Sequence, residues 1–83
     1  MNPSNASAYV TRAGAFANVG RLDKAMEDSE SAIRLNPDDG VAYNNRGYVS
    51  ELSNKIKQAL LDYEIACGLK VDLACRNFKR LSQ

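Results

Sequence analysis

Small and apolar side chains recur at steps of three and four residues along most of this chain, which is the spacing of one face of an α-helix. The first such face carries Ala8, Tyr9, Arg12, Ala13, Phe16 and Val19. Polar and turn-forming residues interrupt the pattern, so we expect an all-α fold. Helices are expected over about residues 6–19, 22–35, 41–53, 56–68 and 73–81, after a loop that ends at residue 5.

The residues between the expected helices are of types that end one helix or begin the next. Gly20 and Asn54 follow the first and third helices, and both residue types tolerate the left-handed backbone that closes a helix. Residues 36–40, Asn-Pro-Asp-Asp-Gly, separate the second helix from the third, because Pro cannot continue a helix and Asp can cap one. Asp72 is expected to cap the last helix.

The chain repeats itself with a period of about 34 residues, which is the signature of a helix–turn–helix solenoid unit. Under this shift, Ala8, Tyr9, Arg12, Ala25, Asp28, Ala32 and Leu35 fall on Ala42, Tyr43, Arg46, Ala59, Asp62, Ala66 and Leu69. Pro37, however, falls on Val71, so the turn residue is lost once. We expect a single domain over residues 1–83, with repeats at about 6–39 and 40–71 and a capping helix at about 72–82.

The composition of the chain argues against several classes of function. A hydrophobic fraction of 45% and a charged fraction of 25% are ordinary for a soluble globular chain. A net charge of +1 and the lack of a long apolar run lead us to expect neither a nucleic-acid nor a membrane partner. The sequence has no His, no Cys/His cluster and no Gly-rich phosphate loop. We therefore expect no metal, no cofactor and no enzymatic activity.

Two helical faces carry the residues of a known family. Tyr9, Ala13, Phe16, Ala25, Ala32 and Pro37, and in the second copy Tyr43, Gly47, Ala59, Tyr63 and Ala66, resemble the tetratricopeptide repeat pattern. The resemblance implies a right-handed superhelix of antiparallel helix pairs, in which the first helix of each pair lines a concave groove. Gly14 and Gly47 lie inside helices, which suggests that a neighbouring helix comes close to each. Ser29, Ser50 and Val71 depart from the pattern.

Two charged pairs stand out against this family pattern. Arg12 and Arg46 occupy a place where the family usually has Leu, and Asp28 and Asp62 follow them at the same separation in each copy, on the facing helix. We predict semi-buried Arg12–Asp28 and Arg46–Asp62 ion pairs inside the two hairpins. The alternative is that each charge simply reaches solvent.

The resemblance places partner contacts in the groove, and a protein or peptide ligand is expected there. The side chains expected to form it are Thr11 and Asn18 in the first repeat and Val41, Asn44, Asn45, Tyr48 and Glu51 in the second, beside Ser7, Val10, Gly14, Ala17 and Leu52. Asn side chains suit the unpaired amides of an extended peptide, and Tyr suits an interface anchor. The alternatives are an ordinary solvated helix face, or a structural module that assembles as a homo-oligomer through its open repeat ends.

One specialisation of the family, the carboxylate clamp for chaperone C-termini, does not fit. It resembles Lys-x-x-x-Asn, then Asn, then Lys-x-x-x-Arg on three successive helices, and only Asn45 matches. The other places hold Ser7-x-x-x-Thr11 and, depending on register, Cys75-x-x-x-Lys79 or Leu73-x-x-x-Asn77. The cluster of Arg76, Lys79 and Arg80 either attracts an acidic segment or is a solvated helix end.

Cys67 and Cys75 lie eight residues apart at the junction of the last two helices. Their spacing resembles the disulfide-stapled junctions of bacterial solenoids with the Sel-type repeat. The alternative is two buried thiols that act as small hydrophobes. The compartment would be cytoplasmic by default, and periplasmic or exported if the disulfide forms.

Overall fold

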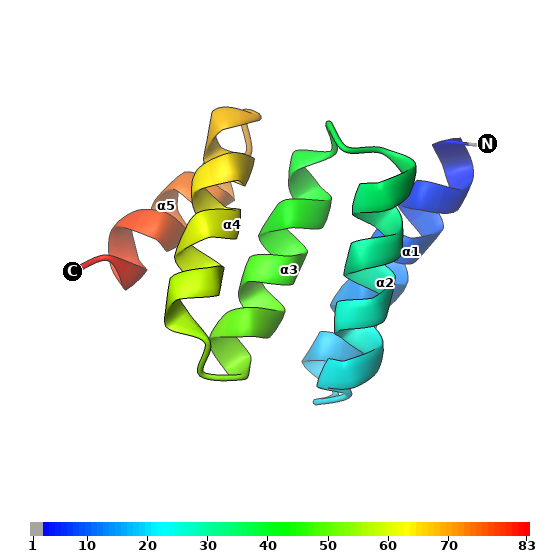
Figure 1. The fold of residues 1–83 in the computed structure, drawn as a ribbon, viewed down its shortest axis with the longest axis horizontal. Coiled ribbons are helices and arrows are strands. Elements are labelled where there is room, and N and C mark those ends of the chain that lie inside the picture. Colours follow the sequence, from blue (N-terminus) through cyan, green and yellow to red (C-terminus); the bar gives the residue numbers. More distant parts are fainter. Residues whose placement is uncertain (1–2) are drawn as a thin grey trace.

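The computed structural model describes residues 3–83, and this part of the chain consists of five α-helices without a strand (Figure 1). They are α1 (Pro3–Asn18), α2 (Leu22–Leu35), α3 (Gly40–Leu52), α4 (Ile56–Gly68) and α5 (Asp72–Leu81). α1 pairs with α2 and α3 with α4 as hairpins, and the five helices follow one another in a row. The all-α fold expected from the sequence is confirmed.

The turns between the helices contain the residues that the sequence predicts for them. Gly20 and Asn54 both adopt the left-handed backbone, with φ of 80° and 62°. Asp39 caps α3, because its Oδ1 accepts hydrogen bonds from the amides of Val41 at 3.0 Å and Ala42 at 3.4 Å. These bonds satisfy amides that have no partner within the helix.

The outer helices begin differently from the prediction. α1 starts at Pro3 and not at residue 6, a position where Pro fits because its missing amide has no helical partner anyway. Residues 1 and 2 of the expected loop lie outside the described residues. Asp72 is the first residue of α5 and not its cap; Val71 takes the cap position and offers no side-chain bond. The prediction of an Asp72 cap is therefore wrong.

The core is built from small residues that let the helices approach one another. Gly47 shows this most directly, because a Cβ atom there would lie 2.9 Å from the Tyr63 ring. The close approach expected at Gly14 is absent: its nearest neighbour would be Nδ2 of Asn45 at 3.9 Å. Tyr63 and Val49 are the bulkiest fully buried apolar side chains, and the fully buried alanines are Ala6, Ala13, Ala25, Ala32, Ala42, Ala59, Ala66 and Ala74.

Two of the apolar residues on the face expected in the first helix are exposed. Val19 lies beyond the end of the helix and reaches solvent. Ala8 is exposed, whereas its repeat equivalent Ala42 is fully buried. The reason is position in the row: α3 lies between α2 and α4, and α1 has a neighbour on one side only (Figure 1).

α5 begins earlier than the repeat predicts. Under the shift that relates the two repeats, Gly40 at the start of α3 would fall on Ala74, but α5 starts at Asp72. The buried Ala42 and Ala74 are equivalent in the observed register, since their amides bond the carbonyls of Asp39 at 3.1 Å and Val71 at 3.0 Å. Of the two registers left open by the sequence, the structure therefore has Leu73-x-x-x-Asn77 in line with Val41-x-x-x-Asn45.

Candidate functional site

The site is a hollow of about 430 Å³ on the side of the molecule formed by α1, α3 and α5. We call it the groove. Its lining residues are Gly14 and Asn18 of α1, Asn44, Asn45, Tyr48, Glu51 and Leu52 of α3, and Leu73, Asn77 and Arg80 of α5.

Most residues expected in the groove from the sequence line it, and several do not. Thr11 and Val41 are exposed but lie outside the hollow. Ser7, Val10 and Ala17 do not line it either, and Ala17 is buried in the core beside Ala25 and Val49. The part of α1 that contributes to the groove is therefore its last turns only, through Gly14 and Asn18.

The α5 residues Leu73, Asn77 and Arg80 were not among the expected groove residues. They line the groove because the observed register of α5 places Asn77 in line with Asn45 and Arg80 in line with Tyr48. That register was one of the alternatives open in the sequence, so aligning α5 with α3 in both registers is the signal that could have found these residues.

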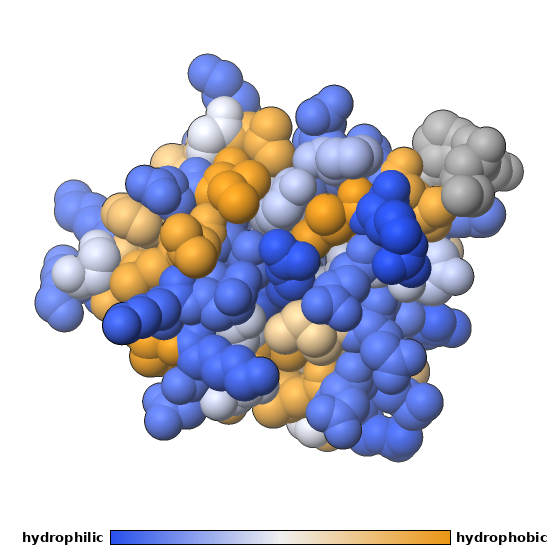
Figure 2. Space-filling view, viewed as in Figure 1, coloured by the Kyte–Doolittle hydropathy of each residue, from blue (hydrophilic) through white to orange (hydrophobic). Residues whose placement is uncertain are grey.

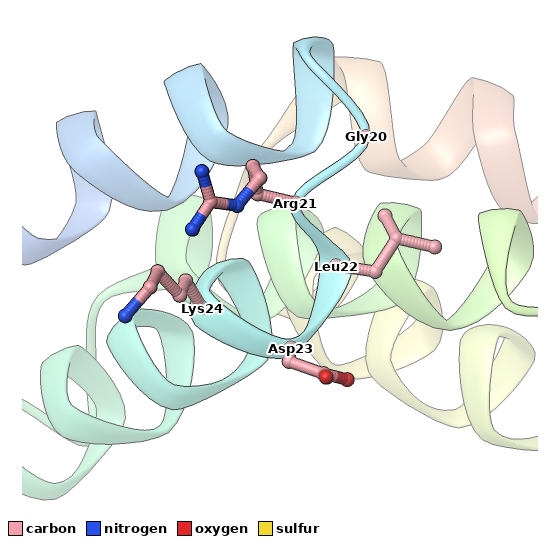
Figure 3. A pocket seen from close by; sticks show the side chains of 5 residues that line it. All are labelled: Gly20, Arg21, Leu22, Asp23 and Lys24. Atoms are coloured by element: carbon pink, nitrogen blue, oxygen red, sulfur yellow. The ribbon is translucent and has the colours of Figure 1, made fainter.

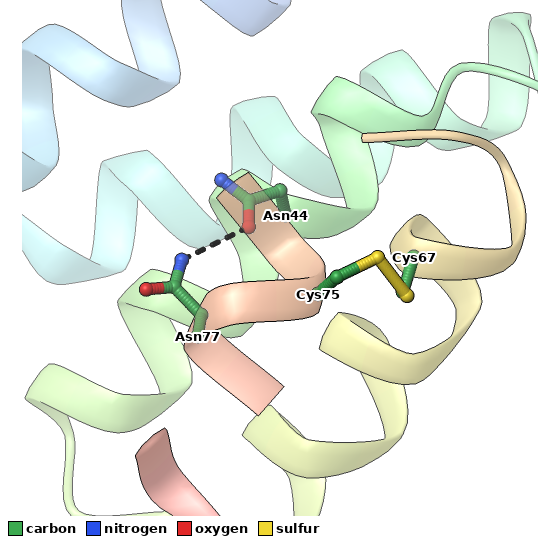
Figure 4. The surroundings of a disulfide bond; sticks show 4 residues. All are labelled: Asn44, Cys67, Cys75 and Asn77. Carbon is green, nitrogen blue, oxygen red and sulfur yellow. Dashed lines mark hydrogen bonds between the residues drawn. A yellow bond between two sulfur atoms is a disulfide. The ribbon is translucent and has the colours of Figure 1, made fainter. Parts of the chain in front are cut away.

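Asparagine side chains connect the helices that form the groove. Asn45 donates its Nδ2 to the main-chain carbonyl of Val10 on α1 at 2.9 Å. Asn77 donates its Nδ2 to Oδ1 of Asn44 at 3.2 Å, which links α5 to α3 (Figure 4). These bonds fix the amide groups in place, so the atoms left free, such as Oδ1 of Asn45, present a set pattern to a ligand.

The groove contains one ion pair that spans α3 and α5. Arg80 donates to both carboxylate oxygens of Glu51, at 2.8 and 2.9 Å, and the hydroxyl of Tyr63 donates to Oε1 of Glu51 at 2.7 Å. The bonds from Arg80 hold the pKa of Glu51 below its usual value. Burial, and next the bond to Glu51, raise the pKa of Tyr63. Among the lining residues, only Glu51 and Arg80 are charged, and they neutralise each other.

Large apolar side chains line the groove beside this ion pair. Tyr48, Leu52 and Leu73 are 39%, 46% and 52% exposed, so each keeps a large part of its surface in water. Covering such surface is favourable, at roughly 25 cal/mol for each Å² removed from water.

Both predicted Arg–Asp pairs are present, and both lie inside the hairpins, apart from the groove. Arg12 donates Nε and Nη2 to Asp28 at 2.7 and 2.8 Å, and Arg46 donates the same atoms to Asp62 at 2.9 and 3.0 Å. The carboxylates are buried, but the Arg12 side chain is 60% exposed and that of Arg46 only 22%. The guanidinium of Arg46 also lies 5.7 Å from the centre of the Tyr43 ring. These pairs are structural.

Cys67 and Cys75 form a disulfide that joins the end of α4 to the first turn of α5 (Figure 4). Their Cα atoms are 4.6 Å apart, within the range that such a bridge requires. The bridge therefore fixes the helix that supplies Leu73, Asn77 and Arg80 to the groove.

A second hollow, of about 340 Å³, lies at the turn between α1 and α2 (Figure 3). Its lining is residues 20–24, with Arg21 and Lys24 extended to one side and Leu22 to the other. Leu22 packs on the core around Ala17, Ala25 and Val49. We interpret this hollow as the shape of a helix turn and not as a binding site.

The face formed by α2 and α4 carries a further apolar stripe (Figure 2). Leu61, Ile65 and Leu69 of α4 are exposed at steps of four residues, so they lie on one side of that helix. None of them lines the groove. They provide matched controls for substitutions of groove residues.

No group of three or more His, Cys, Asp or Glu side chains within residues 3–83 could hold a metal ion. None of the five described helices is long and apolar enough to cross a bilayer.

Comparison with known proteins identifies the repeat. The family model described as "Tetratricopeptide repeat" matches residues 6–39. The chain is 32% identical over 78 residues to "Small glutamine-rich tetratricopeptide repeat-containing protein 2" of Saccharomyces cerevisiae, covering 94% of this chain and 22% of that protein. It is 31% identical over 72 residues to "TPR repeat-containing thioredoxin TDX" of Arabidopsis thaliana, covering 87% and 19%.

A further relative is "DnaJ homolog subfamily C member 7 homolog" of Dictyostelium discoideum, at 32% identity over 69 residues, 83% of this chain and 13% of that protein. The chain thus spans about a fifth or less of the length of these relatives. Three features indicate the same repeat architecture. The family model matches residues 6–39, the second hairpin has the same Arg–Asp pair as the first, and the final helix packs in series with both. The chain belongs to the tetratricopeptide repeat family, as two repeats followed by a capping helix.

Proposed function

We propose that this chain is a non-catalytic module that binds a segment of another protein in the groove. The observation that carries the proposal is the convergence of exposed apolar side chains and fixed asparagine amides from α3 and α5 on one hollow of about 430 Å³, which α1 also lines. Such a mixture of apolar surface with a few oriented polar groups is typical of binding sites.

The side chains of the groove suit an extended segment. Asn45 uses its Nδ2 to bind Val10, which leaves its Oδ1 to accept a hydrogen bond from a ligand amide. Tyr48 and Leu52 lie further along the same side of α3, where they would contact ligand side chains. The ligand would thus gain polar contacts along its backbone and apolar contacts through its side chains.

The composition of the lining supports the non-catalytic part of the proposal. It contains no Ser, Cys, Lys or His, and its one carboxylate, Glu51, is engaged by Arg80 and Tyr63. Although one relative is named a thioredoxin, Cys67 and Cys75 are separated by 8 positions and do not form the C-x-x-C motif of that redox chemistry.

A displayed library of short random peptides tests the proposal, with the wild-type chain compared to Leu52→Ser in the groove and Leu61→Ser on α4. We expect the wild type and Leu61→Ser to enrich the same peptides, and Leu52→Ser to lose them, because only Leu52 lines the groove. Both leucines are about half exposed, so the two substitutions should disturb the fold to a similar extent. Equal enrichment by all three proteins would contradict groove binding.

Self-assembly is a second candidate, and the open side of α1 favours it. Ala8 is bare where its equivalent Ala42 is covered by neighbouring helices, so another repeat could pack there. Sedimentation at increasing concentration tests this with Ala8→Arg, which should abolish any growth in mass, and with Leu52→Ser, which should not. A constant monomer mass for the wild type would exclude this candidate.

A further inference from the structure

We propose that Glu51 determines the specificity of the groove: by neutralising Arg80 it selects uncharged, apolar peptide segments and excludes acidic ones. This inference rests on the proposed function, since it names the class of ligand for the same groove. It follows from the charges, contacts and exposed surfaces of the lining residues.

Arg80, the positively charged side chain in the groove, is already paired with Glu51. Arg80 spends two N–H groups on the two oxygens of Glu51, at 2.8 and 2.9 Å, in the two-bond geometry that makes Arg–carboxylate pairs strong. A ligand carboxylate that approached Arg80 would have to displace Glu51 or lie beside it. Both arrangements bring two negative charges together, which is unfavourable in a partly enclosed site.

Glu51 cannot easily turn away to release Arg80. The Tyr63 hydroxyl donates to its Oε1 at 2.7 Å, and the Tyr63 ring is fully buried between α3 and α4. The Glu51 carboxylate is therefore fixed by its hydrogen bond to the buried Tyr63 on one side and by its bonds to Arg80 on the other. The Glu51 side chain is 21% exposed, against 54% for Arg80, so the carboxylate is the fixed member of the pair.

The basic residues near Arg80 on α5 do not add a second cation to the groove. Neither Arg76 nor Lys79 lines the hollow. The groove as a whole thus carries one positive and one negative charge in contact.

The remaining lining surface favours an apolar ligand. Tyr48, Leu52 and Leu73 face water from α3 and α5, while Asn18, Asn45 and Asn77 supply uncharged polar groups. A neutral peptide with a bulky side chain, such as Leu, Phe or Met, satisfies both parts at once: its side chain covers the apolar surface and its backbone meets the amides.

The test again uses a displayed random-peptide library, with a second library of peptides that end in a free carboxylate. We expect the wild type to select sequences rich in large apolar residues without excess Asp or Glu, and to gain nothing from the free carboxylate. Binding of a selected peptide should change little with added salt, because charge-driven contacts are the ones that salt weakens.

Glu51→Gln is the decisive variant, because Gln keeps an oxygen for the Tyr63 hydroxyl while it removes the charge that neutralises Arg80. We expect this variant to bind acidic peptides about tenfold or more tightly than the wild type does. The reason is that Arg80, no longer paired with Glu51, can form an ion pair with a carboxylate of the peptide. The double variant Glu51→Gln with Arg80→Gln should lose this gain and keep the apolar selection. Arg80→Gln alone leaves Glu51 unpaired and should shift the selection toward basic peptides.

The outcomes separate the inference from the proposed function. If no peptide is enriched in a manner that depends on Leu52, the proposed function fails and the inference fails with it. If Leu52-dependent peptides are enriched but are acidic, groove binding stands and the inference is overturned. An unchanged preference in both Glu51→Gln and Arg80→Gln would overturn it as well.

Discussion

Arg12 and Arg46 occupy equivalent places in the two repeats and make the same bonds, yet they differ in what surrounds them. The side chain of Arg46 is 22% exposed and its partner Asp62 only 1%, whereas Arg12 is 60% exposed. The second repeat has neighbours on both sides, and the first does not. The inner pair should therefore contribute more to stability than the outer one.

Arg46→Leu should lower the free energy of unfolding by about 2 to 3 kcal/mol, because it leaves the Asp62 carboxylate buried without a partner. The figure lies below the roughly 3 to 5 kcal/mol expected for a fully buried pair, since Arg46 still touches solvent. Urea denaturation followed by circular dichroism measures the change.

Arg12→Leu is the matched control and should cost clearly less, because the Arg12 side chain is mostly exposed and water can reach Asp28 once it is removed. Combining Arg46→Leu with Asp62→Leu should recover part of the loss, since the stranded charge is then gone. Equal losses for Arg12→Leu and Arg46→Leu would show that surroundings do not matter at these positions.

A contact between two side chains could be predicted where the same two residue types recur at the same separation in both repeats. Both Arg–Asp contacts follow from a coincidence that occurs at the same separation in each repeat. The exposure of Ala8 could not be predicted in this way, because periodicity says which face a residue is on and not whether another helix covers that face.

At the scale of the helix, two glycines that look alike in the sequence differ in the structure. Gly47 faces the next helix so closely that a Cβ would meet the Tyr63 ring at 2.9 Å and the Ala59 carbonyl oxygen at 3.3 Å. A Cβ at Gly14 would have Nδ2 of Asn45 as its nearest neighbour from another helix, at 3.9 Å. One glycine is thus required by packing, and the other costs helix stability without a packing reason.

Gly47→Ala should destabilise the chain by about 2 kcal/mol, because the added methyl group overpacks the α3–α4 interface. Gly14→Ala should stabilise it by about 0.5 to 1 kcal/mol through the better helix propensity of Ala. Thermal unfolding of the two variants beside the wild type measures both. A loss of stability in Gly14→Ala would mean that α1 and α3 pack more tightly than the structure shows.

Helix positions could be predicted from the sequence to within a few residues, but some of their ends could not. The left-handed turns at Gly20 and Asn54 follow from the residue types. The early start of α1 and the displaced cap of α5 do not, because both depend on how the chain enters the helix and not on the helical pattern. The groove residues of α5 were missed for the same reason: their place depends on the length of the connection before them.

For the molecule as a whole, the Cys67–Cys75 disulfide fixes the last helix of the row. α5 also packs through Ala74, Phe78 and Leu81 on the core around Tyr63, and bonds to α3 through Asn77 and Arg80. Its place thus depends on the covalent link and on these contacts together.

Reduction of the disulfide should lower the free energy of unfolding by about 2 to 3 kcal/mol, the value expected for a bridge that closes a short loop. We also expect α5 to become sensitive to protease before the two hairpins do, because it ends the row and packs mainly on α4. Limited proteolysis with and without a dithiol reductant tests this, with the variant Cys67→Ser and Cys75→Ser as the control that should not respond to the reductant. Simultaneous cleavage in α1 and α5 would contradict it.

The connection between α4 and α5 decides which side of the last helix meets a ligand. If the repeat period had continued unchanged, Lys79 would stand in line with Thr11 and Asn45, but the observed register puts Asn77 there instead. These two positions on a helix differ by a rotation of about 200°. The repeat is two residues shorter, because α4 has one residue fewer than α2 and the connection after it also has one fewer. The shortening turns an ammonium group to the far side and an amide toward the concave surface, so residues that contribute no atom to the groove set its electrostatic character.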